Sequence, residues 1–279
     1  MIKTPLSTVI GGAFWTPEAT IVGGQQGFGQ LIKKLFSNNE QGFFYDPNDL
    51  STMYQDAAGA IPVTDVGQPV GLIRDKSGRN NHAFQTNSAS RPILRKNAVT
   101  GANYLEFDGS DDFLQSNNID FTATDKVSLF TGVRRLSDAG VSIIAEFSTN
   151  SVLNTNSFYL VALSNSALQF NSRGSGNSAT TSSQRFPAPA PVVISSVGDI
   201  SGKVSKIRAN SGGYAVNVGD QGTGNYGNYP LYIGRRGGVA LQFNGHIYGL
   251  IGIGKLVSDN EIVNIEKELA KRVGVTLNV

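Results

Sequence analysis

The sequence contains no cysteine, which excludes a disulfide framework, a thiolate metal site and a cysteine nucleophile. It has only two histidines, His82 and His246, so a zinc centre built from several histidines is excluded as well. Charge of one sign is also scarce, because 23 Lys and Arg face 21 Asp and Glu and leave a formal net charge of +2. We therefore expect no nucleic-acid partner. The most apolar stretch, 247–253, is far below the roughly 20 residues that cross a bilayer, so we expect no membrane insertion.

Short runs of alternating apolar and polar residues begin at Phe43 and continue to residue 253. This alternation is typical of half-buried antiparallel strands. Turn signals such as Asp108-Gly109 and Asn244-Gly245 separate the runs. The pattern predicts an all-β fold over 41–279, a jelly-roll sandwich of two antiparallel sheets. We expect residues 171–190, which are polar and rich in Gly and Pro, to form a long surface loop. The predicted strands are centred on Leu72, Phe107, Leu129, Ala145, Leu160, Ile194 and Gly249.

One helix is predicted at the C-terminal end of the sandwich. Ser258 is a good N-cap, Glu261 completes a capping box, and Gly274 can end the helix. We expect its apolar stripe to cover the sandwich. The stripe consists of Ile262, Ile265, Leu269 and Val273.

Residues 1–40 differ from the rest and are predicted to be an N-terminal arm. The lead is rich in glycine, and apolar residues then recur at helical spacing over 28–37. Such a short helix either docks into a partner or a neighbouring copy, or folds back on its own domain. We favour docking. The docking candidates are Trp15, Phe28, Leu31, Ile32, Leu35 and Phe36.

Three segments in this order resemble the concanavalin A-like lectin/glucanase domains of the laminin-G-like type. They are 75–83 (DKSGRNNHA), 105–113 (LEFDGSDDF) and 231–262, and the resemblance covers roughly 70–272. It implies the same two-sheet sandwich and a lectin or a glucan hydrolase function.

A narrower resemblance concerns 41–56 (QGFFYDPNDLSTMYQD) and 67–73 (GQPVGLI), which are similar to a segment preceding such domains in tailed-bacteriophage structural proteins. It implies a virion protein, assembled in the host cytoplasm, that contacts other virion proteins through residues 1–40. A tail-fibre or receptor-binding role implies a homo-oligomer, for example a trimer, and host surface polysaccharide as a ligand. The alternative is a capsid decoration or head-fibre protein.

Catalysis has one candidate pair, Glu106 and Asp108, which alternate on a predicted strand. With Asp111 they resemble the Glu-x-Asp-x-x-Glu pattern of laminarinase-type glucanases, but an Asp replaces the last Glu. Asp108-Gly109 is also typical of a turn. We therefore expect no enzymatic activity, and a polysaccharide-degrading glycosidase using this pair is the alternative.

Calcium is the one cofactor that the sequence suggests, through the acidic cluster Asp108, Asp111 and Asp112. A turn rich in Asp also forms without metal, through hydrogen bonds from its own backbone. We favour this second interpretation and expect no other cofactor.

Sugar binding is expected where an aromatic face and hydrogen-bonding side chains gather in loops. The segment 225–229 and the arginines that follow it supply these residue types. The alternative is a turn rich in Gly and Asn whose tyrosines pack on the sheet or on a neighbouring subunit. The carbohydrate-binding candidates are Asn225, Tyr226, Asn228, Tyr229, Arg235 and Arg236.

Overall fold

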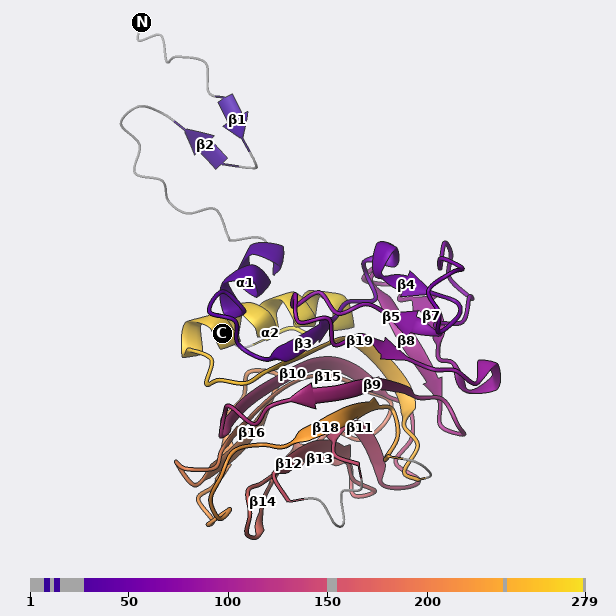
Figure 1. The fold of residues 1–279 in the computed structure, drawn as a ribbon. Helices are drawn as coiled ribbons and strands as arrows, with labels where there is room; N and C mark the ends of the chain where they lie inside the picture. Colours follow the sequence, from indigo (N-terminus) through magenta and orange to yellow (C-terminus); the bar gives the residue numbers. More distant parts are fainter. Residues whose placement is uncertain (1–7, 11–12, 16–27, 150–154, 238–239, 278–279) are drawn as a thin grey trace, which may run out of the picture.

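The computed structural model describes residues 8–10, 13–15, 28–149, 155–237 and 240–277. Two antiparallel sheets face one another in it, and a long helix near the C-terminus lies on one of them (Figure 1). The predicted two-sheet sandwich with a C-terminal helix is therefore confirmed. None of the helices in the described ranges is long and apolar enough to span a membrane.

The first sheet has eight strands in the order β17-β16-β15-β10-β19-β8-β7, with β3 beside β19. The second has nine strands in the order β14-β13-β12-β11-β18-β9-β6-β5-β4. The eight strands are β17 (Ala215–Asn217), β16 (Val204–Ala209), β15 (Ala190–Asp199), β10 (Lys126–Arg135), β19 (Asn244–Ile253), β8 (Asn103–Asp108), β7 (Ile93–Lys96) and β3 (Gly42–Tyr45). The nine are β14 (Ser178–Arg185), β13 (Ala167–Arg173), β12 (Ser157–Ala162), β11 (Ser142–Phe147), β18 (Asn228–Ile233), β9 (Leu114–Asp120), β6 (Ala83–Phe84), β5 (Leu72–Ile73) and β4 (Met53–Tyr54).

The remaining elements are short apart from the C-terminal helix. They are the hairpin of β1 (Thr8–Ile10) and β2 (Ala13–Trp15), the helices α1 (Phe28–Leu35) and α2 (Asp259–Val273), and the 3-10 turns η1 (Leu50–Thr52) and η2 (Ser88–Ser90). In α2 the predicted capping box is present, with the Glu261 carboxylate accepting from the Ser258 backbone N–H at 3.4 Å. Gly274 ends α2 at a φ of 83°, which favours glycine.

Alternation along the strands places one set of apolar side chains between the sheets. This inter-sheet core is mostly aromatic and aliphatic, and its largest members are wholly buried. They include Phe107, Leu129, Phe147, Phe158, Phe170 and Leu231.

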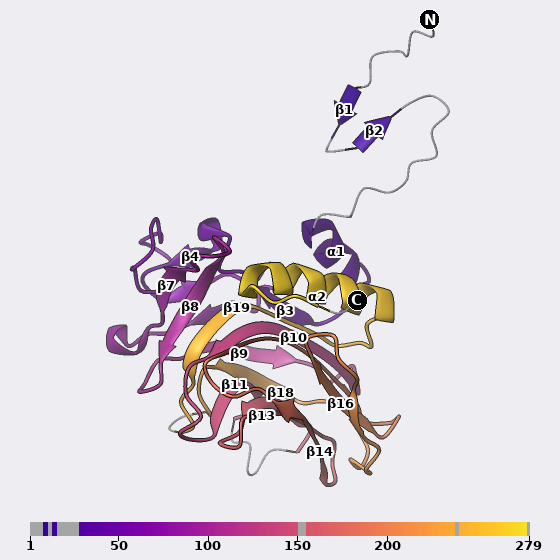
Figure 2. The same cartoon turned by 180° about the vertical axis from the view of Figure 1, so that it is seen from behind.

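A second core lies on the outer face of the eight-stranded sheet, where α2 and α1 cover it (Figures 1 and 2). Leu31, Ile32, Leu35 and Phe36 of the α1 segment are all buried in it, at 4% exposure or less. The Lys255 ammonium also donates to the Leu35 carbonyl at the end of α1.

The prediction that these four side chains dock into a partner is therefore wrong. Folding back removes the apolar face of α1 from water, which favours the intramolecular contact. The boundary predicted at residue 40 moves accordingly, because α1 packs as part of the sandwich. Phe28 is half-buried, with its ring edge-on to Phe44 at 5.4 Å. Trp15 ends β2, and its side chain lies outside the described residues.

The surface loop predicted for residues 171–190 is also wrong over most of its length. β13 continues to Arg173, β14 pairs with it from Ser178 to Arg185, and β15 begins at Ala190. Ser and Thr residues form β14 because hydrogen bonding to β13 outweighs their local preference for turns.

Residues 75–83, one of the three segments that resemble concanavalin A-like domains, form a turn that is hydrogen-bonded to β3. The Asp75 carboxylate accepts from the backbone N–H groups of Phe44 at 2.8 Å, Ser77 at 2.8 Å and Asn81 at 3.0 Å. A buried carboxylate with so many donors fixes the loop beside the sheet, so this motif has a structural role.

Candidate functional site

The predicted sugar-binding loop 225–229 does not present its first tyrosine to solvent. Tyr226 is 1% exposed, its ring lies edge-on to Phe158 at 5.5 Å, and its hydroxyl is 2.6 Å from the Ser172 hydroxyl. The expectation that Tyr226 binds a ligand is therefore wrong, because this ring is part of the inter-sheet core. Burial raises the pKa of its hydroxyl well above the usual value for tyrosine, so it stays a neutral hydrogen-bonding group.

The other members of this loop are divided between core and surface. Tyr229 is half-buried, with its ring 5.5 Å from that of Phe147. Asn225 and Asn228 are exposed, and the Asn225 side-chain amide donates to the Thr122 carbonyl at 2.6 Å. Tyr226 and Tyr229 thus both pack on the sheet, as in the alternative to sugar binding.

Arg235 and Arg236 lie beyond the opposite end of β18 from Asn228. A strand of six residues at about 3.3 Å per residue separates the two groups by about 20 Å. The six predicted sugar-binding residues therefore do not form one site.

Arg236 belongs instead to an ion pair that the sequence does not reveal. Its Nε donates to Oε2 of Glu146 at 2.8 Å, and the Ser148 hydroxyl donates to Oε1 of the same carboxylate at 2.8 Å. The Glu146 side chain is wholly buried, whereas that of Arg236 is 24% exposed. A buried carboxylate needs such partners, and here it fixes the arginine against the sheet.

The strand register places the Glu146 carboxylate in a row of polar and aromatic residues. Glu146 is directly opposite Tyr232 on β18 and Tyr159 on β12, and Tyr159 is opposite Asn171 on β13. Their sequence neighbours, such as Phe147, fill the inter-sheet core, so the row lies on the outer face of the nine-stranded sheet. We call this row the tyrosine row. Its members are Gln115, Tyr232, Glu146, Tyr159, Asn171 and Thr180.

The two tyrosines of the row are half-buried and stay protonated. Burial is the main cause that raises the pKa of both hydroxyls, and the Glu146 charge raises it further. For Tyr159, the guanidinium groups of Arg236 and Arg173 act in the opposite direction without reversing the shift. The Arg236 guanidinium carbon is 5.4 Å from the centre of the Tyr159 ring. Both hydroxyls are therefore neutral donors and acceptors around neutral pH.

No helix covers the tyrosine row in the described part of the chain. Both α1 and α2 lie on the opposite side of the sandwich, over β10, β15 and β19 (Figures 1 and 2). A sheet face with partly exposed aromatic rings and fixed hydrogen-bonding groups can therefore meet a ligand.

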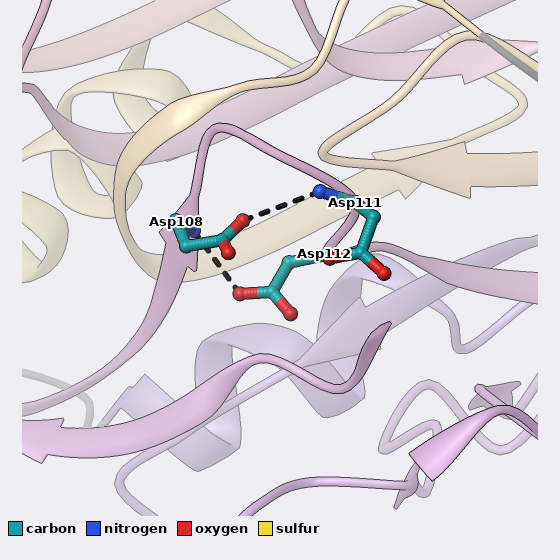
Figure 3. A group of neighbouring side chains, drawn as sticks. All are labelled: Asp108, Asp111 and Asp112. Atoms are coloured by element: carbon teal, nitrogen blue, oxygen red, sulfur yellow. Dashed lines mark hydrogen bonds between the residues drawn. The ribbon is translucent and has the colours of Figure 1, made fainter. Parts of the chain in front are cut away.

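The acidic cluster lies on the turn after β8 (Figure 3). Asp108, Asp111 and Asp112 each offer an oxygen within 4.8 Å of the others. The turn uses these carboxylates itself, because Asp108 accepts from the Asp111 N–H at 3.3 Å and Asp112 accepts from the Asp108 N–H at 3.0 Å. Burial, reinforced by the neighbouring carboxylates, raises the pKa of Asp112 to about 6. The oxygen chemistry suits calcium, yet the backbone hydrogen bonds account for the cluster without it.

The predicted catalytic pair is engaged in local interactions. Glu106 is about one-third exposed and pairs with the Nε of Arg95 at 3.1 Å. Asp108 stands at the end of β8, where its Oδ1 accepts from the Ser110 N–H at 2.7 Å. Both carboxylates therefore have structural partners.

A groove at the edge of the sandwich was not predicted from the sequence. It has a volume of about 440 Å³ and lies between β14 and the turn before β17. Phe186 and Tyr214 line it together with serines, and its Arg208 forms a bidentate pair with the buried Glu266 at 2.7 and 2.8 Å. The groove forms only where the edge strands of the two sheets, β14 and β17, approach one another, so no local sequence signal marks it.

Comparison with known proteins supports the fold. No protein-family model and no curated protein matches the sequence. Among solved structures, the botulinum neurotoxin serotype C1 binding domain is similar with a TM-score of 0.56 and 12% identity, over 83% of this chain and 52% of that chain. The serotype D ligand-binding domain in complex with N-acetylneuraminic acid has a TM-score of 0.54 and 10% identity, over 85% and 52%.

A third similar structure is an arabinofuranosidase complexed with arabinofuranosyl-α-1,2-xylobiose, with a TM-score of 0.52 and 11% identity, over 73% and 51%. The chain thus spans about half the length of each of these structures. The shared feature is a lectin-like β-sandwich.

Proposed function

We propose that this protein is a non-enzymatic glycan-binding protein, and that the tyrosine row is its binding surface. The observation that carries the proposal is the row itself, in which Tyr232 and Tyr159 flank the buried Glu146 on a sheet face that no helix of the described ranges covers. Sugar rings have an apolar face that packs on aromatic rings, and hydroxyls that need fixed donors and acceptors. Gln115 adds an amide group to the same row, whereas the Asn171 amide is buried and donates to the Thr180 hydroxyl at 2.7 Å.

Two of the structurally similar proteins support a sugar ligand. One was solved with N-acetylneuraminic acid and the other with arabinofuranosyl-xylobiose. Because one of them is a glycosidase, the fold is compatible with binding and with hydrolysis. We favour binding, since Glu106 and Asp108 are held by Arg95 and by the turn. Glu146 is likewise held by Ser148 and Arg236.

The biological setting that we propose is a bacteriophage virion, in a tail-fibre or receptor-binding role with host surface polysaccharide as the ligand. The resemblance of residues 41–56 to phage structural proteins supports it. Since α1 packs on the sandwich, residues 1–27 become the proposed arm that contacts other virion proteins, and we propose a homo-oligomer such as a trimer. Immunogold labelling of particles tests this setting: label at the tail supports it, and uniform label on the head favours a capsid decoration protein instead.

A glycan array probed with the whole chain tests the binding function. We expect Tyr159→Ala and Tyr232→Ala each to weaken binding about tenfold, because each removes one stacking ring. Phe186→Ala in the edge groove is the matched control and should leave binding unchanged. If Phe186→Ala alone weakens binding, the groove is the site. Absence of binding to every glycan would overturn the proposal.

A further inference from the structure

The charges around the tyrosine row do not balance. The one carboxylate of the row, Glu146, is already neutralised by Arg236. Two further arginines, Arg235 and Arg173, flank the row, and neither has a carboxylate partner among the residues that the structure describes. Two arginines beside the tyrosine row thus have no carboxylate partner in the described residues, although the whole chain is almost neutral.

Arg235 lies at the β9 end of the row. Its guanidinium carbon is 5.1 Å from the centre of the Phe113 ring, and Phe113 stands two residues before Gln115. Phe113 comes directly before β9, and extending the alternation of that strand by one residue places Phe113 and the arginine on it on the side of the tyrosine row. The Nε of Arg235 is buried without an acceptor in the described part of the chain. Because this Nε is buried, a ligand can meet only the two Nη groups of Arg235, and no carboxylate in the described part of the chain pairs with them.

Arg173 lies at the opposite end of the row, on β13. It follows Asn171 by two residues, so both point to the same face. Its Nε donates to the Gly176 carbonyl at 2.9 Å, which leaves its charge uncompensated. Its influence on the pKa of Tyr159, which it lowers against the rise caused by burial, agrees with this position.

The two arginines lie at the first and the last of five neighbouring strands. From β9 to β13 the order is β9-β18-β11-β12-β13, which is four spacings of about 4.8 Å, or about 19 Å across the strands. Phe113 and Arg173 also lie on opposite sides of the row, each two residues from it along its strand, so the line between the two arginines is diagonal and about 23 Å long. A single sugar does not span this distance, but an extended chain lying across the strands does. Arginine forms bidentate hydrogen bonds with carboxylates, so a chain with a carboxylate at each end of the row fits both positions.

We infer that the ligand of this face is an acidic polysaccharide, whose carboxylates are recognised by Arg235 and Arg173 while its rings pack on the tyrosines. This inference rests on the proposed glycan-binding function and specifies its ligand class. Arg236 acts differently, because its charge is used to hold the Glu146 carboxylate.

The test compares acidic polysaccharides with their carboxyl-reduced forms. Polygalacturonate, alginate, hyaluronan and polysialic acid, each with its reduced counterpart, are titrated against the whole chain by biolayer interferometry. We expect at least one acid to bind about tenfold more tightly than its reduced form, and to bind more weakly as salt increases. Oligomers long enough to reach both arginines should bind more tightly than short ones of the same acid.

Four variants complete the test. Arg235→Gln and Arg173→Gln should each weaken binding of the acid about tenfold, and Arg235→Lys should retain part of it because the charge remains. Arg134→Gln removes an exposed arginine from the eight-stranded sheet and should change nothing.

Equal binding of acid and reduced form, or acid binding that neither Arg235→Gln nor Arg173→Gln weakens, would overturn the inference. In both cases loss of binding in Tyr159→Ala would still support the glycan-binding function. Failure of the protein to bind any probe, acidic or reduced, would overturn the inference and count against that function as well.

Discussion

The outer faces of the two sheets differ, although both sheets are built from strands with alternating side chains. Helices cover one outer face, and no helix in the described ranges covers the other. On the eight-stranded sheet the outward residues are apolar, among them Phe44, Phe130 and Ile251, and α2 and α1 cover them. On the nine-stranded sheet the outward positions hold Glu146, Tyr159 and other members of the tyrosine row. The comparison teaches that outward side chains, more than strand pattern, decide whether a face becomes a second core or a surface for ligands.

The largest effect on the free energy of unfolding is expected on the face that α1 and α2 cover. Leu35 of α1 is wholly buried, so Leu35→Ala should lower the free energy of unfolding by about 3 kcal/mol through lost burial and a cavity. Urea denaturation measures it. Leu256→Ala, at a leucine that is 45% exposed, is the control and should cost less than about 0.5 kcal/mol. Equal, small effects at both positions would mean that α1 does not contribute to the fold.

On the face of the tyrosine row, loss of the ion pair between Glu146 and Arg236 should also lower the free energy of unfolding. Arg236→Ala leaves the Glu146 carboxylate buried without its cation and should lower the free energy of unfolding by about 2 kcal/mol. The double variant Glu146→Gln, Arg236→Ala removes the unpaired charge and should regain part of this loss. If the loss of unfolding free energy in the double variant equals the sum of the losses in Glu146→Gln and Arg236→Ala, the two side chains are not coupled.

A smaller effect is expected at the rim, where the pKa of Asp112 is raised to about 6, mainly by burial. The folded state then binds more protons than the unfolded state between about pH 4 and pH 6, so the free energy of unfolding falls as pH rises through this window. Asp112→Asn removes the charge and should stabilise the protein at pH 7 by about 1 kcal/mol, with the gain lost below about pH 4.

The control for this variant is Asp120→Asn. Hydrogen bonds from the Thr122 side chain and backbone lower the pKa of Asp120, so its charge is favoured in the folded state. Asp120→Asn should therefore give no gain at pH 7. Stabilisation by both substitutions would show that general charge removal, rather than the environment of Asp112, is the cause.

The smallest effect is expected from calcium. Since backbone N–H groups already bind the carboxylates of Asp108 and Asp112, we expect neither added calcium nor EDTA to shift the melting temperature. Differential scanning fluorimetry measures this. A clear rise with calcium that is absent in Asp111→Asn would establish a metal site.

The sequence predicted those features that depend on residues close together in the chain. The capping box of Ser258 and Glu261, the alternating strands and the turn after Asp108 all belong to this group. The sandwich followed from them, because strands without intervening helices have few ways to pack.

The tyrosine row could not be predicted, because it depends on the register of distant strands. Glu146 and Arg236 are ninety residues apart, and a shift of one residue in either pairing would turn the carboxylate into the core. The packing of Tyr226 and of α1 also depended on partners far along the chain. Residue types therefore indicated a sugar-binding chemistry, while only the fold showed which side chains share a face.

The most direct test of the binding surface is hydroxyl-radical footprinting of the whole chain with and without a glycan that it binds. The readout is the oxidation rate of individual tyrosines. Bound glycan should protect Tyr159 and Tyr232, whereas Tyr54 and Tyr214, which lie outside the tyrosine row, should react unchanged. Protection of Tyr214 with unchanged rates at Tyr159 and Tyr232 would place the ligand in the edge groove and contradict the account.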